Sequence, residues 1–328
     1  MIEKTSFLTS KLFEKDFISK EQLDDFKEYK AKNIFSLNTE LLLLMYASVM
    51  LFTSGIGVLV YQNIDSIGHI AILAFVLLLT VLCFYFSFKN APTFNKLETK
   101  FKNPIYDYVV LTGSILSCIF LGYAQFQYAV FGLDYKWVSL SSALICFVIA
   151  YYFDSRMVLS IALTALTTFI GITLTPQKFF ENEFMSNPVL LFSGIVLGVM
   201  LVVWTIYSEK VGLKKHFYFV FYTFAQHLIG ICCLSGLFQE QWYLFLPIFL
   251  CFIYYFYKLS YTYFATSFFV FTLLYGFIGL NTVLSKVFDN SFLIEFIIMI
   301  SPFYFIGSIV VFISLVKKFN KEKHASIS

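Results

Sequence analysis

Residues 188–207 read PVLLFSGIVLGVMLVVWTIY, and residues 208–215 read SEKVGLKK. The first stretch carries no charge, and about 20 such residues cross about 30 Å of hydrocarbon as a helix. A membrane-spanning strand alternates apolar and polar residues, which this block does not do. Because Lys and Arg resist translocation, the lysines that follow are typical of a cytoplasmic loop. The pattern predicts a transmembrane helix whose C-terminal end faces the cytoplasm.

Ten apolar stretches of this kind follow one another along the chain. Hydrophobic residues make up 59% of the sequence and charged residues only 13%, whereas soluble domains are about 25% charged. The expected spans are 41–61, 67–88, 108–131, 136–153, 157–175, 188–207, 216–238, 242–257, 261–280 and 292–316. We therefore predict an all-α, polytopic membrane helix bundle, with a polar segment at 1–40 before it and a basic tail at 317–328 after it.

The basic residues predict the orientation of this bundle. If the N-terminus is cytoplasmic, 20 of the 23 Lys and Arg residues fall on the inner side, and only Lys136, Lys178 and Lys286 fall outside. A span count that differed by one would destroy this alternation. We expect both termini to be cytoplasmic. The excess of Lys over Arg is typical of an AT-rich genome and favours a bacterial inner membrane.

The polar N-terminal segment contains a helix start. Ser19 and Gln22 have the spacing of a capping box, and Ile18 and Leu23 occupy the two positions of a hydrophobic staple. The residues that follow form a short amphipathic helix, which we expect to lie on the membrane surface. Docking of a protein partner on this helix is the alternative.

Polar side chains within the spans are candidate functional residues, because burying them in lipid is costly. His227 and its neighbour Gln226 lie near the middle of the span 216–238, and Glu295 lies one turn into the last span. A neutral imidazole in this position can relay a proton or hold a substrate hydroxyl. The alternative for His227 is a hydrogen bond with Gln226 or with a threonine of a neighbouring helix, which is common in membrane bundles.

A second candidate site lies at the predicted outer ends of the first three spans. Asn63, Asp65 and His69 occupy the first outer turn, and Gln125 and Gln127 stand near the outer end of the third span. The two glutamines point about 200° apart on a helix, so only one of them can face a shared ligand. These residues form either a polar outer vestibule or ordinary water-exposed loops.

A third candidate site is the tight inner turn around Asp154 and Arg156, the one arginine of the chain. The planar guanidinium of Arg156 suits bidentate pairing with a carboxylate, so we expect an ion pair with Asp107 or Asp154. A lipid phosphate is another partner for Arg156. Asp154 has a structural alternative, as the cap that starts the helix after the turn.

Patterns for catalysis and for cofactors are absent from the sequence. It contains no P-loop, GxSxG, HExxH or Rossmann glycine pattern, and its six cysteines form no CxxC pair. We therefore expect no cofactor and no metal, and no sequence pattern indicates that the protein is an enzyme. The small positive net charge of +3 points to membrane lipids as partners rather than to nucleic acid.

One weak internal repeat joins two pairs of spans. With an offset of 105 residues (242 minus 137), Trp137 aligns with Trp242, without gaps. The segment 137–175 then corresponds to 242–280, and the two pairs of spans would be parallel copies, each with a tight cytoplasmic turn. Repeats of this kind are frequent in transporters but occur in other duplicated bundles as well.

Several of these stretches together are similar to one family of bacterial membrane proteins. They are Gly55-Ile56-Gly57-Val58-Leu59, Asn63-Ile64-Asp65, Gly68-His69, Asp107-Tyr108, the segment 122–128 and Phe153-Asp154-Ser155-Arg156. Over roughly residues 15–176 the chain resembles domain-of-unknown-function family 2157, in the form found in Bacteroidetes. Ile64 stands where the wider family often has tryptophan. The resemblance implies a polytopic membrane protein without an established activity.

Three functions are compatible with these features. A transporter or lipid-handling protein is favoured by analogy with other short-looped bundles of this size. A membrane scaffold or sensor that acts through its N-terminal helix is the first alternative. An intramembrane enzyme on a lipid-linked substrate is the second alternative. The sequence gives no indication of the oligomeric state.

Overall fold

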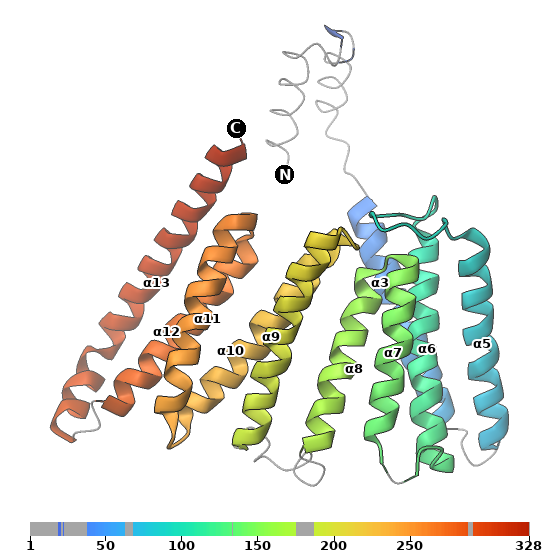
Figure 1. The fold of residues 1–328 in the computed structure, drawn as a ribbon, viewed down its shortest axis with the longest axis horizontal. Coiled ribbons are helices and arrows are strands. Elements are labelled where there is room, and N and C mark those ends of the chain that lie inside the picture. Colours follow the sequence, from blue (N-terminus) through green and yellow to red (C-terminus); the bar gives the residue numbers. More distant parts are fainter. Residues whose placement is uncertain are drawn as a thin grey trace. The chain divides into compact units, whose positions relative to one another are not determined.

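The fold was analysed in a computed structural model (Figure 1). It describes residues 19–20, 22, 38–62, 68–132, 134–174, 187–287 and 291–327. Side chains are described in the same ranges except at 38–40, 60–61, 174, 291–302 and 325–327. The chain divides into two compact units, residues 1–56 and residues 57–328. Helix α3 begins in the first unit and ends in the second.

Ten of the described helices are long and apolar enough to cross a membrane. They are α3 (Asn38–Gln62), α5 (His69–Asn90), α6 (Ile105–Tyr128), α7 (Lys136–Phe153), α8 (Arg156–Leu174), α9 (Pro188–Val211), α10 (Tyr218–Phe238), α11 (Trp242–Tyr263), α12 (Thr266–Val287) and α13 (Ser291–Ile327). A short 3₁₀ helix, η2 (Lys215–Phe217), precedes α10. The prediction of an all-α bundle with ten spans is therefore confirmed.

In the first unit, the described part of the polar segment confirms the capping box. The backbone N–H of Gln22 donates to Oγ of Ser19 over 3.2 Å, and the backbone N–H of Ser19 donates to Oε1 of Gln22 over 2.9 Å. Ile18, Leu23 and the amphipathic face expected after them lie outside the described residues.

In the second unit, consecutive helices pack as antiparallel pairs, and glycines bring some of them close together. A Cβ atom at Gly194 or Gly198 of α9 would lie 2.4 Å from the side chain of Cys232 or Ile229 of α10. Close backbone approach at small residues is the usual means of helix association in membranes, where burial in lipid gives no hydrophobic driving force between helices.

Two helix pairs are joined by turns of the same form, and these turns contradict the ungapped repeat. Asp154 (φ 62°) ends α7 and Phe264 (φ 46°) ends α11, both in the left-handed conformation. An offset of 105 residues places Ser155 of the first turn on Ser260, which lies inside α11. The repeat is wrong at this point, because α11 continues beyond the aligned position before it turns.

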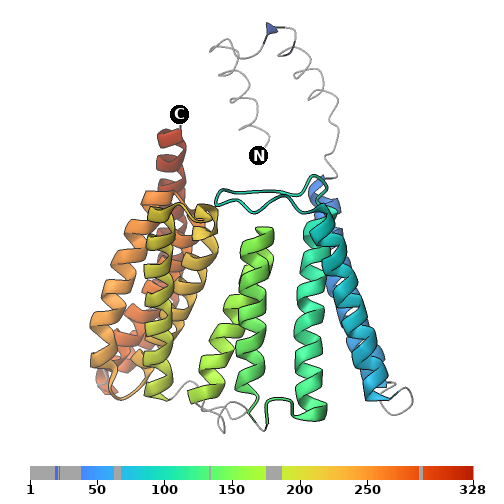
Figure 2. The same cartoon turned by 45° about the vertical axis from the view of Figure 1, so that its right-hand side comes forward.

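A loop of fourteen residues, 91–104, joins α5 to α6, and we call it the strap. It does not return directly to α6 but extends toward the turn between α9 and α10 (Figure 2). There the backbone N–H of Lys214 donates to the carbonyl oxygen of Lys96 over 2.7 Å. The strap therefore lies beside the α7–α8 and α9–α10 turns, at what we call the Asp154 end of the second unit.

Candidate functional site

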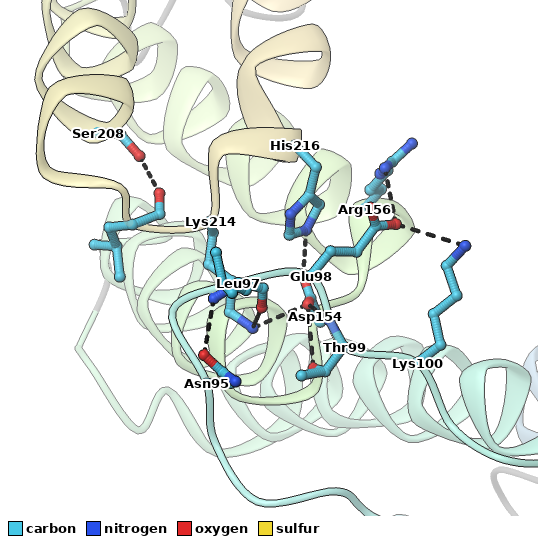
Figure 3. Close-up of polar contacts among 11 residues, drawn as sticks. Asn95, Leu97, Glu98, Thr99, Lys100, Asp154, Arg156, Ser208, Lys214 and His216 are labelled. Atoms are coloured by element: carbon cyan, nitrogen blue, oxygen red, sulfur yellow. Dashed lines mark hydrogen bonds and ion pairs between the residues drawn. The ribbon is translucent and has the colours of Figure 1, made fainter.

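The most strongly connected polar group at the Asp154 end is the carboxylate of Asp154 itself (Figure 3). Asp154 follows the last residue of α7, where its left-handed backbone conformation turns the chain into α8. Asp and Asn tolerate this conformation better than most other residues. The side chain of Asp154 is 0% exposed, so its charge has to be compensated by the protein.

Three residues from distant parts of the sequence compensate this charge. Nζ of Lys214 lies 2.9 Å from Oδ2 of Asp154, and Nε2 of His216 hydrogen-bonds to Oδ1. Thr99 of the strap donates to Oδ2 from its backbone N–H over 2.6 Å and from its hydroxyl over 3.2 Å. We call these four residues the Asp154 cluster. Charge-assisted hydrogen bonds of this kind are about twice as strong as neutral ones.

Lys214 is held in place by its backbone as well as by its ammonium group. It lies between α9 and η2 in the left-handed conformation, with φ at 48°. Its Nζ also donates to the carbonyl oxygen of Leu97 over 3.4 Å and lies 5.3 Å from the centre of the Phe94 ring. The cluster thus fastens the strap to two helix turns at once.

The predicted ion pair of Arg156 with Asp107 or Asp154 is wrong. Arg156 instead pairs with Glu98 of the strap, with 3.1 Å between Nη2 and Oε1, and Lys100 lies 3.7 Å from the same carboxylate. The physical reason is burial: Asp154 faces inward and is neutralised by Lys214, whereas Arg156 is half exposed and meets the exposed Glu98. Among the described ion pairs, none contains Asp107.

The predicted cap at Asp154 is also corrected. The side chain that caps α8 belongs to Ser155, whose Oγ accepts from the backbone N–H of Val158 over 3.4 Å. The Asp154 carboxylate is engaged in the cluster, so the neighbouring serine caps the helix in its place.

The intramembrane candidates His227 and Gln226 both bond to α12. Nδ1 of His227 lies 2.9 Å from the hydroxyl oxygen of Tyr275. Nε2 of Gln226 donates to the carbonyl oxygen of Phe268 and to Oγ1 of Thr272, each over 2.9 Å. Gln226 is fully buried, and its Oε1 has no protein partner. The structure therefore places both residues in interhelical hydrogen bonds, but the partner of His227 is Tyr275 rather than Gln226 or a threonine. The side chain of Glu295 lies outside the described residues.

The outer candidates do not converge on one point in the described residues. Asn63 and Asp65 lie outside the part that the structure describes. Nδ1 of His69 lies 2.8 Å from the Tyr123 hydroxyl oxygen. Gln125 is buried and clamps the following loop, donating to Gly132 and accepting from the backbone of Phe131. Gln127 is half-buried on a different side of α6, as the helical spacing predicted.

An apolar groove lies between α11, α12 and α13. Its volume is about 740 Å³. The residues lining it include Tyr257, Gly276, Phe277, Tyr304, Gly307 and Phe312. Several lining residues, among them Leu280 and Val311, are also exposed on the outer surface of these helices. The groove therefore opens sideways, toward the hydrocarbon that surrounds a membrane-spanning bundle.

Aromatic contacts close this groove at both ends. Toward the Asp154 end, the fully buried Phe319 of α13 stacks on Phe269 of α12 with 4.3 Å between ring centres. At the other end, Phe277 stacks on Tyr304 with 6.1 Å between centres. Gly276 and Gly307, which line the groove between these contacts, contribute no side chain to fill it.

Sequence reasoning missed the residues that complete the site. The sequence indicates Lys214 only as one of the basic residues of a cytoplasmic loop, and it gives no role to Thr99 or His216. The sequence offers one clue, the run Gly212-Leu213-Lys214-Lys215-His216, which concentrates cations directly after a glycine that ends a helix. Among the described residues, no three His, Cys, Asp or Glu side chains are placed to hold a metal ion.

Comparison with known proteins gives one match. Residues 10–159 match the model of the family described as predicted membrane protein (DUF2157), which confirms the resemblance found in the sequence. No curated protein and no solved structure matches the chain. The matched part includes Thr99 and Asp154, whereas Lys214, His216 and the groove lie beyond it.

Proposed function

We propose that this multi-pass membrane protein handles a membrane lipid, whose acyl chain lies in the groove between α11, α12 and α13. The observation that carries the proposal is the groove itself. It has about 740 Å³ of space, a lining that is mostly apolar, and a side that opens toward the hydrocarbon. Ligand sites generally have volumes of about 300–1,000 Å³ and an apolar lining with a few polar groups.

The polar groups of the lining are hydroxyls, which suits a largely apolar ligand. Tyr257, Thr272, Tyr304 and Ser308 contribute them, but two are already engaged in their own helices. Thr272 donates to Phe268, and Ser308 donates to Phe305. A polar, water-soluble substrate would find few free partners there, whereas an acyl chain needs none.

The intramembrane histidine supports lipid handling over a polar transport path. His227 and Gln226 join α10 to α12 by hydrogen bonds. These bonds favour a fixed contact between the two helices, because opening a path there would leave polar groups unpaired in lipid. The proposal places the protein in a bacterial inner membrane, with the Asp154 end in the cytoplasm, on the strength of the basic residues alone.

Filling the groove tests the proposal. A Cβ atom at Gly307 meets nothing within 4 Å, so Gly307→Leu fits the helix and occupies the space intended for the lipid. Gly122→Leu on α6 is the matched control, since a Cβ atom there is equally free. Lipid retained by the purified full-length protein is measured by native mass spectrometry.

The proposal expects Gly307→Leu to lose most of the retained lipid at unchanged thermal stability, while Gly122→Leu retains it. Equal retention by both variants would overturn the proposal. If Gly307→Leu is unstable, Gly307→Ala and Gly276→Ala reduce the space in the groove by smaller amounts. Lipid retention that does not fall in these variants would also contradict the proposal.

A further inference from the structure

We propose that the groove selects an anionic phospholipid, with the phosphate bound by Lys258 and Lys318 at the Asp154 end. This inference rests on the proposed function, because it names the lipid that the groove would hold. Moving an acyl chain from the bilayer into an apolar groove exchanges one apolar environment for another, so the groove alone discriminates poorly between lipids. The headgroup contacts therefore have to provide the selectivity.

The face of α13 that lines the groove also carries a lysine, just beyond the groove. Four groove-lining residues of α13 are spaced four, three and four positions apart: Tyr304, Ser308, Val311 and Leu315. Positions three and four apart lie on one face of a helix. Lys318 is three residues beyond Leu315, so it continues this face about one turn past the groove, toward the Asp154 end.

Helix α11 brings a second lysine to the same end. Tyr257 lines the groove, and Lys258 is the next residue. One turn further, Tyr261 packs edge-on against Phe319 with 5.0 Å between ring centres. This contact brings α11 and α13 together beside the end of the groove. Both Lys258 and Lys318 are exposed, so their ammonium groups are accessible to a headgroup.

Basic residues outnumber acidic ones around this end of the groove. Besides Lys258 and Lys318, the end of α13 carries Lys317, Lys321 and Lys323, so five lysines face two acidic residues, Glu322 and Glu209, whose carboxylate accepts from Tyr263 of α11. Lys323 lies 3.4 Å from Oγ1 of Thr266, which anchors α13 to α12. The remaining lysines stand where the spans end, at the depth of lipid phosphates, and long lysine side chains reach that layer readily.

The direction of the groove matches a phospholipid held in one leaflet. It runs from the middle of α12 toward the end of α11, and it closes at the Phe269–Phe319 stack, which Lys318 directly precedes on α13. An acyl chain that enters from the side therefore has its glycerol and phosphate at the level of Lys258 and Lys318. A second copy of the chain would instead need an acidic surface to face these lysines.

The test compares two lipids that differ only in headgroup charge. The purified full-length protein is offered phosphatidylglycerol and phosphatidylcholine with identical acyl chains, and the bound lipids are counted by native mass spectrometry. We expect a preference for phosphatidylglycerol that falls about fivefold with each of Lys258→Gln and Lys318→Gln, the equivalent of about 1 kcal/mol per lysine. Lys89→Gln with Lys102→Gln, exposed lysines of the same end but remote from the groove, is the matched control.

The outcomes separate this inference from the proposed function. If Gly307→Leu lowers the retention of both lipids but the lysine variants keep the preference, the inference fails and lipid handling stands. If the control variant loses the preference as well, general surface charge explains it and the inference fails. If Gly307→Leu changes the retention of neither lipid, both proposals fail.

Discussion

Nζ of Lys214 lies 2.9 Å from Oδ2 of Asp154, and both side chains are fully buried, although 60 residues separate them in the sequence. The pair joins the α7–α8 turn to the α9–α10 turn, and Thr99 brings the strap to the same carboxylate. Burial of two charges is unfavourable unless every partner is present. The second unit therefore depends on an intact Asp154 cluster at this end.

Replacement of the lysine tests this dependence. Lys214→Met leaves the Asp154 carboxylate buried beside only His216 and Thr99, and removing one partner of a buried ion pair costs about 3–5 kcal/mol. We expect a large fall in the thermal unfolding temperature of the purified protein. In an Asp154→Asn background the same replacement should cost much less, because no buried charge is left unpaired. Equal costs in both backgrounds would show that the ion pair is not the source of the effect.

Replacement of the arginine should have little effect on stability. Arg156 is 51% exposed and pairs with Glu98, which is 41% exposed, and exposed ion pairs contribute about 0–1 kcal/mol. We expect Arg156→Gln to unfold within a few degrees of the native protein in the same measurement that detects Lys214→Met. A loss as large as that of Lys214→Met would mean that Arg156 has a buried partner after all.

Replacement of the intramembrane histidine should leave lipid retention unchanged. His227→Phe removes the hydrogen bond to Tyr275 but keeps a ring against Phe271, whose centre lies 4.5 Å from that of His227. Hydrogen bonds between membrane helices contribute about 0.6 kcal/mol on average. The expected result is a slightly less stable protein that retains as much lipid as before. Loss of retention, or of a solute flux, in a well-folded His227→Phe variant would favour a path through the bundle.

The orientation can be measured independently. Single cysteines placed after Lys102 and after Glu240 occupy the strap and the α10–α11 turn, which lie at opposite ends of the described helices. The basic residues predict that an impermeant thiol reagent added to intact cells labels the position after Glu240 and not the position after Lys102. Labelling of both positions from one side contradicts the topology, and the reverse pattern contradicts the orientation.

The ten helices were predictable because each needs only its own run of apolar residues. The capping box of Ser19 and Gln22 was predictable for the same reason, since its hydrogen bonds span three residues. An interhelical hydrogen bond of His227 followed from the cost of leaving a polar group unpaired in lipid, although its partner Tyr275 did not. In each case the physical cause acts over a short stretch of sequence.

The Asp154 cluster could not be predicted in the same way. Its formation requires the strap to extend toward the α9–α10 turn, and nothing local to Thr99 or Lys214 encodes that direction. Arg156 was assigned to the wrong carboxylate because sequence alone does not reveal which acid is buried. The groove is equally invisible in the sequence, since Gly276 and Gly307 resemble any other small residues of a membrane helix.

Photo-cross-linking of a bound lipid tests whether an acyl chain lies in the groove between α11, α12 and α13. A phospholipid with a photoreactive group in its acyl chain is incorporated into membranes that contain the full-length protein, and the labelled peptides are identified by mass spectrometry. Lipid handling through the groove predicts labels concentrated at the lining segments 272–280 of α12 and 304–315 of α13, and reduced by Gly307→Leu. Labels spread evenly over lipid-exposed residues such as Ile70 and Val148, and unchanged in Gly307→Leu, would contradict it.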